Sequence, residues 1–394
     1  DRLYYIVKGN LLNKEFVENR TEGFEEFLNH INGLDIDHLA SVAGVDKQLV
    51  KEAAIAYATA KNSMEFHGLG VTEHEQGSKT VMLIADLAMI TGNIGRRGVG
   101  VNPLRGQNNV QGAADMGCQP HQGAGYFPVA DKKIQDFYTE KYGAVHPTKA
   151  GLKIPEIFDA AINKEVKGLW IIGEDIVQTD PNSAHVIKAM ESLDLLVVQE
   201  IFMSETAKLA DVVLPGTTFL EKDGTFTNTE RRVQRVNKAA EPLPGTKPDG
   251  VIVTEMMQKL GYDQPTYDAD QVLAEVADVV PFFKGITRER LGKLGLQWPV
   301  KEDGTDTKIL HEKEFKLGKG RLKSFDWKES TEIKNNIKEY PLILTTSRVL
   351  QHYNAATMTR RTKNLNIVDE DILLVNPIDA CLLYTSDAAD DTCC

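Results

Sequence analysis

Between residues 168 and 217, short apolar runs alternate with helical patterns, and this alternation restricts the possible folds more than any other feature of the chain. Residues 168–172, 195–198 and 211–214 (GLWII, LLVV and DVVL) have the composition of buried strands. Residues 182–192 and 205–209, which lie between them, have the spacing of helices. Strands that alternate with helices form parallel, doubly wound sheets, so we predict an α/β fold.

Polar or glycine-containing segments follow each predicted strand, at residues 173–175 (GED), 199–200 (QE) and 215–217 (PGT). Ligands of doubly wound sheets bind beyond the carboxyl ends of the strands. Any one of these segments is typical of an ordinary turn. Three in succession favour a nucleotide-like ligand at this edge of the sheet.

Residues 101–117, VNPLRGQNNVQGAADMG, fit neither helical nor strand spacing and are predicted to form a loop. Five side-chain amides accompany one cation, Arg105, and they belong to Asn102, Gln107, Asn108, Asn109 and Gln111. Amides suit the mixed donor and acceptor edges of a pterin or purine, and a guanidinium suits a carboxylate or phosphate. The loop is therefore predicted to hold a polar ligand, with a solvated surface loop as the alternative that composition leaves open.

The run at residues 105–112, RGQNNVQG, followed by DMG at 115–117, closely resembles the active-site segment of molybdenum- or tungsten-dependent formate dehydrogenases. The resemblance continues through GEDIVQTDP, VVQEIFMSETAKLADVVLP and EKDGTFTNTERRVQRV. It implies a multi-domain molybdopterin oxidoreductase fold with doubly wound sheets and a C-terminal β-barrel. It also implies a molybdenum or tungsten bis-molybdopterin guanine dinucleotide, with reversible two-electron oxidation of formate to carbon dioxide.

The same resemblance implies roles for individual residues. Arg105 would orient the carboxylate of formate, and Gln107 would lie close to the metal. Contacts to the cofactor are expected from Leu69, Glu73, His74, Asp175, Thr179, Gln199, Gly216, Asp249, Arg348, His352 and Thr357. For His74 a packing role is the equal alternative.

Some positions depart from the family or carry no ligand role. Glu73 stands where the family usually has Gln, and Ala114 stands where relatives commonly have Cys. His67 and His121 are interpreted as packed or capping residues. The arginines of the charged segment 221–236 are interpreted as a solvated face in preference to phosphate contacts, and they are Arg231, Arg232 and Arg235.

In this family the metal-ligating cysteine or selenocysteine and the cysteines of a 4Fe–4S cluster precede the region that matches this chain. We therefore expect no metal ligand here and no turnover by this fragment alone. The resemblance implies electron-transfer partners, which could be iron–sulfur, NAD-linked or ferredoxin-linked subunits or a hydrogenase. It favours a cytoplasmic protein, with a periplasmic one as the alternative. The competing functions are another molybdopterin oxidoreductase, such as a nitrate reductase, or a non-catalytic scaffold subunit like that of respiratory complex I.

With 394 residues, several domains are expected. Residues 1–107 are assigned to a partial α/β cofactor-binding domain and residues 108–218 to a second α/β domain that binds the dinucleotide. Residues 219–339 are assigned to a connecting region, and residues 340–380 to the truncated start of the barrel, with a strand from residue 341. Residues 381–394 resemble the translation of a sequencing adapter and are expected to be an artefact.

Local patterns predict the remaining elements. Residues 4–60 are helical, with Asp46 as the cap of an alanine-rich helix, and a strand ends near residue 67. Ser78 is predicted to cap a helix that runs to about residue 90, after which a glycine-rich turn leads to the Arg105 loop. That turn has the spacing of neither a dinucleotide fingerprint nor a P-loop.

Charge and cysteine content exclude some classes of protein. The net charge of −12 disfavours a nucleic-acid-binding surface, and no apolar run is long enough to span a bilayer. Three of the four cysteines lie in the adapter-like tail, which leaves Cys118. The sequence therefore predicts neither a disulfide framework nor a cysteine-based metal site.

Overall fold

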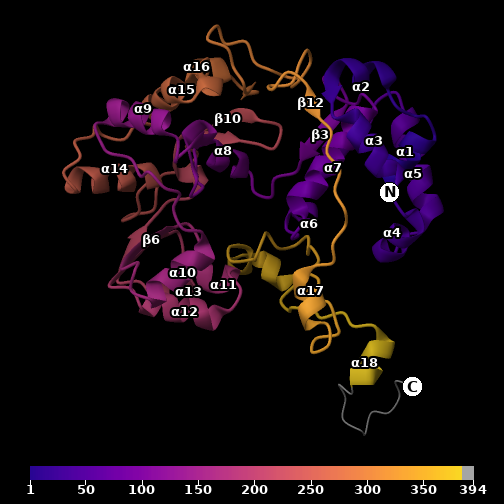
Figure 1. Ribbon diagram of the computed structural model, residues 1–394. Helices are drawn as coiled ribbons and strands as arrows, with labels where there is room; N and C mark the ends of the chain where they lie inside the picture. The colour runs from indigo at the N-terminus through magenta and orange to yellow at the C-terminus, as the bar shows by residue number, and fades with distance from the viewer. Residues whose placement is uncertain (384–394) are drawn as a thin grey trace.

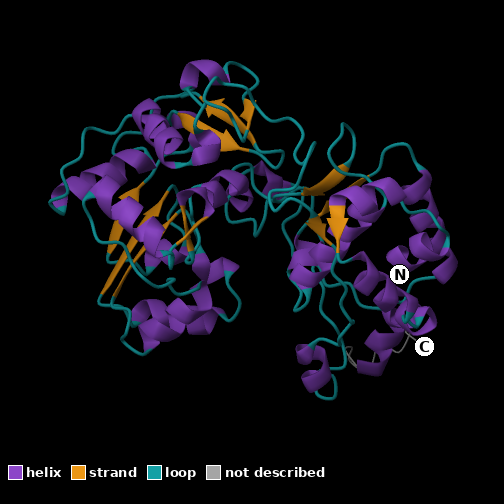
Figure 2. Cartoon of the chain, turned by 45° about the horizontal axis from the view of Figure 1, so that its top comes forward, coloured by secondary structure: helices purple, strands orange, loops and turns teal. Residues whose placement is uncertain are grey.

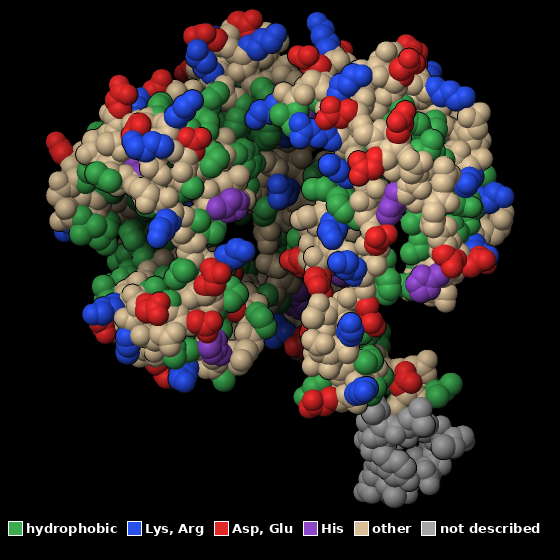
Figure 3. Space-filling view, in the orientation of Figure 1, with side chains coloured by type: hydrophobic (Ala, Val, Ile, Leu, Met, Phe, Trp, Pro, Cys, Tyr) green, Lys and Arg blue, Asp and Glu red, His purple; other side chains and the backbone are tan. Residues whose placement is uncertain are grey.

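The computed structural model describes residues 1–383, with side chains up to residue 380. Residues 384–394 of the tail that we expect to be adapter-derived lie outside the described residues. The chain forms two bodies (Figure 1). The first body contains α1–α7 with β2 and β3, and the second is built around the sheets β6–β8 and β9–β11. Figure 3 shows a deep hollow between them.

The first body is a group of helices around one apolar core. Its helices are α1 (Arg2–Lys8), α2 (Lys14–Arg20), α3 (Phe24–Asn32), α4 (Ile36–Ala43), α5 (Lys47–Thr59), α6 (Leu69–Thr72) and α7 (Gly77–Ile90). Ile6, Phe27 and Leu87 are almost completely buried in the core that they share. The predicted cap is confirmed, because the Asp46 carboxylate accepts hydrogen bonds from two backbone N–H groups in the first turn of α5.

The predicted cap of α7 at Ser78 is wrong by two residues, because the N-cap position is Gln76. The helix begins at Gly77, whose N–H donates to the carbonyl of His74 at 2.8 Å. A Cβ on Gly77 would lie 2.2 Å from the carbonyl oxygen of Thr72. After the short connection of residues 73–76, the chain thus enters α7 at a position that only glycine can occupy, which places Ser78 inside the helix.

A two-stranded parallel sheet forms the edge of the first body. It pairs β2 (Met64–His67) with β3 (Gly100–Pro103), and His67 lies opposite Pro103 at its carboxyl end. The strand predicted to end near residue 67 is confirmed. Residues 101–117 are predicted to form one irregular loop, but the loop itself covers only residues 104–109. The stretch begins within β3, and α8 (Val110–Asp115) forms near its end.

The predicted parallel sheet is confirmed and forms the centre of the second body (Figure 2). Its strands β6 (Gly168–Ile172), β7 (Leu195–Glu200) and β8 (Val212–Pro215) pair in that order, all in parallel. The helices that pack with this sheet are α10 (Ile154–Ile162), α11 (Ile176–Thr179), α12 (Ser183–Glu191) and α13 (Glu205–Lys208). Val186 and Val198 are fully buried in the core between sheet and helices.

A second sheet in the same body is antiparallel. It contains β9 (Gly224–Thr227), β10 (Arg232–Val236) and β11 (Leu296–Gln297), and its core includes Val233 and Val280. Other elements of this body are β4 (Gln122–Gly123), η1 (Ala124–Tyr126), β5 (Phe127–Pro128), α9 (Lys132–Tyr142), η2 (Phe219–Glu221), α14 (Asp249–Lys259), α15 (Ala269–Val279), η3 (Pro281–Phe283) and α16 (Arg288–Leu291).

The predicted connecting region, residues 219–339, contributes to both bodies. Its first part forms the antiparallel sheet, whereas Phe315 and Leu322 pack into the core of the first body. There β12 (Gly320–Arg321) pairs in parallel with β1 (Thr21–Glu22). The domain bounds stay a prediction.

The C-terminal segment does not form the predicted strand. Residues 341–349 carry no secondary structure, and the side chain of Leu344 is 80% exposed. A strand needs a neighbouring backbone, and no described strand pairs with this segment. The elements that do form here are α17 (Thr331–Asn336), η4 (Thr359–Arg361), η5 (Lys363–Asn366) and α18 (Pro377–Leu383).

None of the helices in residues 1–383 has the length and apolar character needed to cross a bilayer.

Candidate functional site

The carboxyl ends of β2 and β3 bring two of the predicted site segments together. The backbone N–H of Leu104 donates to the carbonyl of His67 at 2.7 Å, so the chain leaves both strands at one edge. From this edge start the segments that carry Leu69 and Arg105. Leu69 is 60% exposed on α6, which lies on the side of the first body that faces the second (Figure 1).

The other predicted residues of these segments are accessible too. Glu73 and His74 are exposed, and Gln107 is partly buried. The His74 ring is tied back to its own segment, because Nε2 lies 2.9 Å from the carbonyl oxygen of Gly70. His67 is buried as predicted, although its Nδ1 has no hydrogen-bond partner among the described residues.

Arg105 is held by its backbone and by one nitrogen of its side chain. Its backbone N–H donates to Thr229 Oγ1 at 3.0 Å, and Thr229 in turn donates to the carbonyl of Pro103 at 2.6 Å. Its Nε–H donates to Gln111 Oε1 at 3.2 Å. The side chain is exposed, and its two terminal nitrogens have no hydrogen-bond partner within residues 1–383. This leaves a guanidinium fork available for an anion.

Asp115 organises the buried side of the same loop. Its Oδ1 accepts hydrogen bonds from Gln111 Nε2 at 2.9 Å and from the Tyr126 hydroxyl at 2.7 Å, and its Oδ2 accepts one from Trp298 Nε1 at 2.9 Å. Asp115 is fully buried, and this burial raises the pKa of its carboxyl against the opposing effect of those hydrogen bonds. Sequence reasoning missed this group because Trp298 lies far away along the chain.

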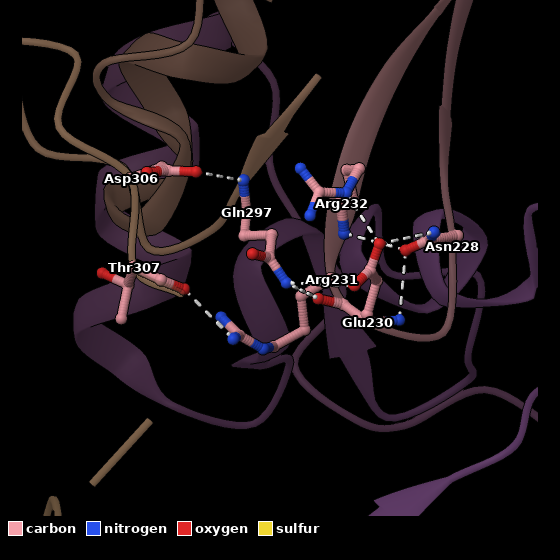
Figure 4. A network of polar contacts seen from close by, with 7 residues as sticks. All are labelled: Asn228, Glu230, Arg231, Arg232, Gln297, Asp306 and Thr307. Carbon is pink, nitrogen blue, oxygen red and sulfur yellow. Dashed lines mark hydrogen bonds and ion pairs between the residues drawn. The ribbon is translucent and has the colours of Figure 1, made fainter. Parts of the chain in front are cut away.

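The turn between β9 and β10 supports Thr229, and Figure 4 shows its polar contacts. Arg231 donates to the carbonyls of Trp298 and Thr307, and its guanidinium lies 5.5 Å from the centre of the Trp298 ring. Burial lowers the pKa of Arg231. The predicted solvated face is therefore wrong for Arg231, whose side chain turns inward to satisfy backbone carbonyls.

Neighbouring side chains complete the turn. Asn228 Oδ1 accepts from the backbone N–H groups of Glu230 and Arg232, at 3.1 and 3.0 Å. Arg232 is partly buried and pairs with Glu230 at 2.7 Å, and Gln297 Nε2 donates to the Glu230 carbonyl at 3.0 Å (Figure 4). Arg235 is exposed, as predicted.

A second cluster lies at the carboxyl ends of β7 and β8. Gln199 Nε2 donates to Asp249 Oδ1 at 2.7 Å, and Lys222 forms an ion pair with Asp249 Oδ2. A Cβ on Gly216 would lie 3.1 Å from Asp249 Oδ1, so glycine leaves room beside this carboxylate. The structure therefore brings three of the predicted cofactor residues together.

Two buried polar atoms at this edge lack a partner among the described residues. They are Oε1 of Gln199, a residue only 1% exposed, and Oγ1 of Thr217, which is 4% exposed. Buried polar atoms without partners are unusual in folded proteins. An amide oxygen, a hydroxyl and a carboxylate beside an open backbone suit the hydrogen-bonding edges of a purine nucleotide. Sequence reasoning gave Thr217 no cofactor role of its own.

Asp175 and Thr179 lie at the same sheet edge, but their hydrogen bonds are internal. Asp175 Oδ1 accepts from the backbone N–H and the hydroxyl of Thr206, at 3.0 and 2.7 Å. Thr179 donates to Glu174 Oε1 at 3.2 Å. In this structure Asp175 ties the end of β6 to α13, and its cofactor role stays a prediction.

The predicted residues of the C-terminal segment lie near one another. Arg348 donates to the carbonyl of Asn354 at 3.3 Å, and the His352 ring contacts Thr359 Oγ1 at 3.0 Å and the Val368 carbonyl at 2.6 Å. Thr357 is partly buried in the same segment. Figure 1 shows this segment reaching toward α11.

One contact ties the C-terminal segment to the sheet. The guanidinium of Arg361 lies 5.1 Å from the centre of the Phe202 ring, just after β7. Within the described chain, no group of three or more His, Cys, Asp or Glu side chains could hold a metal ion. Cys118 is a free, exposed thiol.

Comparison with known families confirms the resemblance noted in the sequence. Residues 15–259 match the family described as Molybdopterin oxidoreductase. The F420-dependent formate dehydrogenase subunit alpha of Methanocaldococcus jannaschii is 46% identical over 95% of this chain, and formate dehydrogenase H of Escherichia coli is 38% identical over 90%. The chain spans 56% and 50% of the lengths of these two relatives.

The fold is also found among solved structures. Acetylene hydratase from Pelobacter acetylenicus superposes with a TM-score of 0.67 and 21% sequence identity, over 97% of this chain and 57% of that one. At this identity the match concerns the fold alone, and it agrees with the predicted α/β class.

Proposed function

The chain belongs to the molybdopterin oxidoreductase family, and from this premise we propose that it is part of the catalytic subunit of a formate dehydrogenase. The named relatives support this proposal, as does the RGQNNVQG segment that carries Arg105. The observation on which it depends is the exposed Arg105 guanidinium, which is held at Nε and, within the described chain, free at both terminal nitrogens.

Arg105 would bind formate. A guanidinium donates two parallel hydrogen bonds to the two oxygens of a carboxylate, which fixes the direction of the formate C–H bond. When bound, a molybdenum or tungsten pterin centre accepts the two electrons released as formate becomes carbon dioxide. Gln107, two residues after Arg105, would offer an amide beside the same centre.

The cluster at the ends of β7 and β8 would hold one dinucleotide of the cofactor. Guanine presents adjacent N–H donors that suit the Asp249 carboxylate, and the unpartnered atoms of Gln199 and Thr217 would gain hydrogen bonds. These features support the guanine dinucleotide form. Leu69, Glu73 and His74 at the first edge, and Arg348 and His352 in the C-terminal segment, would contact other parts of the cofactor.

The assembled enzyme would pass its electrons to partner subunits. Three archaeal relatives, 40–46% identical to this chain, are named as F420-dependent formate dehydrogenase subunits, which supports F420 as the electron acceptor.

The test is anaerobic expression of the complete gene product that contains this chain. We expect stoichiometric molybdenum or tungsten and formate-dependent reduction of methyl viologen, without reduction of nitrate. Metal-loaded protein that reduces nitrate and ignores formate would indicate another oxidoreductase of the family. Protein that carries no metal would indicate a scaffold subunit.

A further inference from the structure

We propose that Asp115 is a positioning residue for Arg105. It fixes the orientation of the Gln111 amide, and this amide in turn holds the Arg105 side chain in place. This inference rests on the proposed function, in which Arg105 binds formate. Asp115 does not contact the substrate in this scheme. Its effect passes through one hydrogen bond to Gln111 and a second from Arg105 to Gln111.

The direction of the Gln111 amide follows from its neighbours. A carboxylate can only accept hydrogen bonds, so the side of Gln111 that faces Asp115 is the NH2 group, 2.9 Å away. The same nitrogen donates to the Tyr126 hydroxyl at 2.8 Å. The oxygen of Gln111 is thereby left pointing at Arg105, whose Nε–H can only donate.

Three features show that this arrangement is maintained at a cost to the fold. Asp115 is the last residue of α8, where the helix dipole disfavours a carboxylate, and it is fully buried. Tyr126 reaches it from a left-handed backbone conformation, with φ of 62°, which bulky residues rarely adopt. Unfavourable features that converge on one carboxylate are typical of functional positioning.

The first variant is Asp115→Asn in the complete enzyme. The introduced asparagine would keep its oxygen toward the Trp298 indole and turn its NH2 group toward Gln111. The Gln111 amide would then rotate so that its oxygen faces the introduced asparagine. Its NH2 group would face the Nε–H of Arg105, and two donors cannot form a hydrogen bond. We expect the KM for formate to rise about tenfold or more, with a smaller change in kcat, since the loss of one hydrogen bond to a charged group has this magnitude.

A second substitution should reverse this effect. In the double variant Gln111→Glu with Asp115→Asn, the introduced glutamate carboxylate accepts from the introduced asparagine amide and still accepts from Arg105 Nε. We expect the KM to return to within about threefold of the wild-type value. Gln111→Glu alone should also raise the KM, because the introduced carboxylate then faces that of Asp115. A merely structural role for Asp115 would give additive losses.

A readout that needs neither cofactor nor turnover is available in the cofactor-free form of the complete gene product. The Nε–H of Arg105 should exchange with solvent about tenfold more slowly than that of exposed Arg235, because it is hydrogen-bonded. Nitrogen-15 NMR measures both rates, and Arg105→Lys assigns the signal. Protection should vanish in Asp115→Asn and return in the double variant. If Asp115→Asn fails to fold, Gln111→Met removes the same acceptor and should also abolish protection.

The outcomes separate this inference from the proposed function. Wild-type enzyme that ignores formate would overturn the proposed function, while the NMR measurement still decides the link from Asp115 to Arg105. Unchanged exchange and KM in Asp115→Asn, or a double variant no better than the single ones, would overturn the inference.

Discussion

The indole Nε1 of Trp298 donates a hydrogen bond to Oδ2 of Asp115 over 2.9 Å, although the two residues lie 183 positions apart in the sequence. The bond joins the end of α8 to the segment that follows β11. The Trp298 ring also packs against Phe282, with centroids 4.7 Å apart and the ring planes tilted by 44°, and it lies beneath Arg231. One side chain thus links the apolar core of the second body to the loop that carries Arg105.

We expect Trp298→Phe to lower the free energy of unfolding by about 1–3 kcal/mol, because Asp115 Oδ2 would stay buried without its donor. Urea unfolding at neutral pH measures this. The control is Trp327→Phe, at a position 48% exposed, where we expect little change. Equal losses in the two variants would show that the indole hydrogen bond contributes nothing.

Replacing Arg105 with Lys in the complete enzyme should reduce kcat/KM for formate by about 10- to 150-fold. Lysine keeps the charge but loses the planar fork that donates two hydrogen bonds, each worth about 1.5–3 kcal/mol to a charged acceptor. Steady-state kinetics with a dye acceptor measure the change. Arg235→Lys, at an exposed arginine that donates to Asn237, is the matched control and should behave as wild type. An active Arg105→Lys enzyme with normal formate kinetics would contradict the assigned role.

Asp249→Asn should weaken retention of the cofactor. The change removes the charge that Lys222 and Gln199 now contact, and with it a charged acceptor for guanine. Loss of one such hydrogen bond corresponds to about a tenfold weaker affinity. Metal analysis and guanine nucleotide content after gel filtration measure retention, and Asp263→Asn, at an exposed position near the end of α14, is the control. Full retention by Asp249→Asn would remove Asp249 from the binding site.

Stability should fall between pH 4 and pH 7 because of Asp86. This carboxyl is 1% exposed in α7, and burial raises its pKa from 3.8 to about 7. The folded chain therefore binds one more proton than the unfolded chain in that range, so the free energy of unfolding decreases as pH rises. The full effect is on the order of 4 kcal/mol at about 1.4 kcal/mol per pKa unit.

The comparison that isolates Asp86 is Asp86→Asn. We expect this variant to lose the decrease and to be more stable than wild type at pH 8, by urea unfolding at a series of pH values. Asp369→Asn, at an exposed position, should keep the wild-type profile. Parallel profiles for wild type and Asp86→Asn would show that Asp86 titrates normally.

The sequence by itself determined the parallel sheet β6–β8, the helix capped by Asp46, and the segment that carries Arg105. These features are local: short apolar runs between helical patterns indicate strands, a cap needs only its own first turn, and a motif is read in one stretch. Gln199 and Gly216 could be grouped because parallel strands end at one edge, whereas Asp249 was added to them only through the family resemblance.

Only the tertiary structure decided the contacts that join distant segments. It turned Arg231 and Asp175 inward, brought Leu322 into the core of the first body, and set Trp298 against Asp115. It also left residues 341–349 without a strand partner among the described residues. The physical reason is that such contacts depend on which backbone and side-chain groups meet once the chain has folded, and neither hydrophobic spacing nor local propensity carries that information.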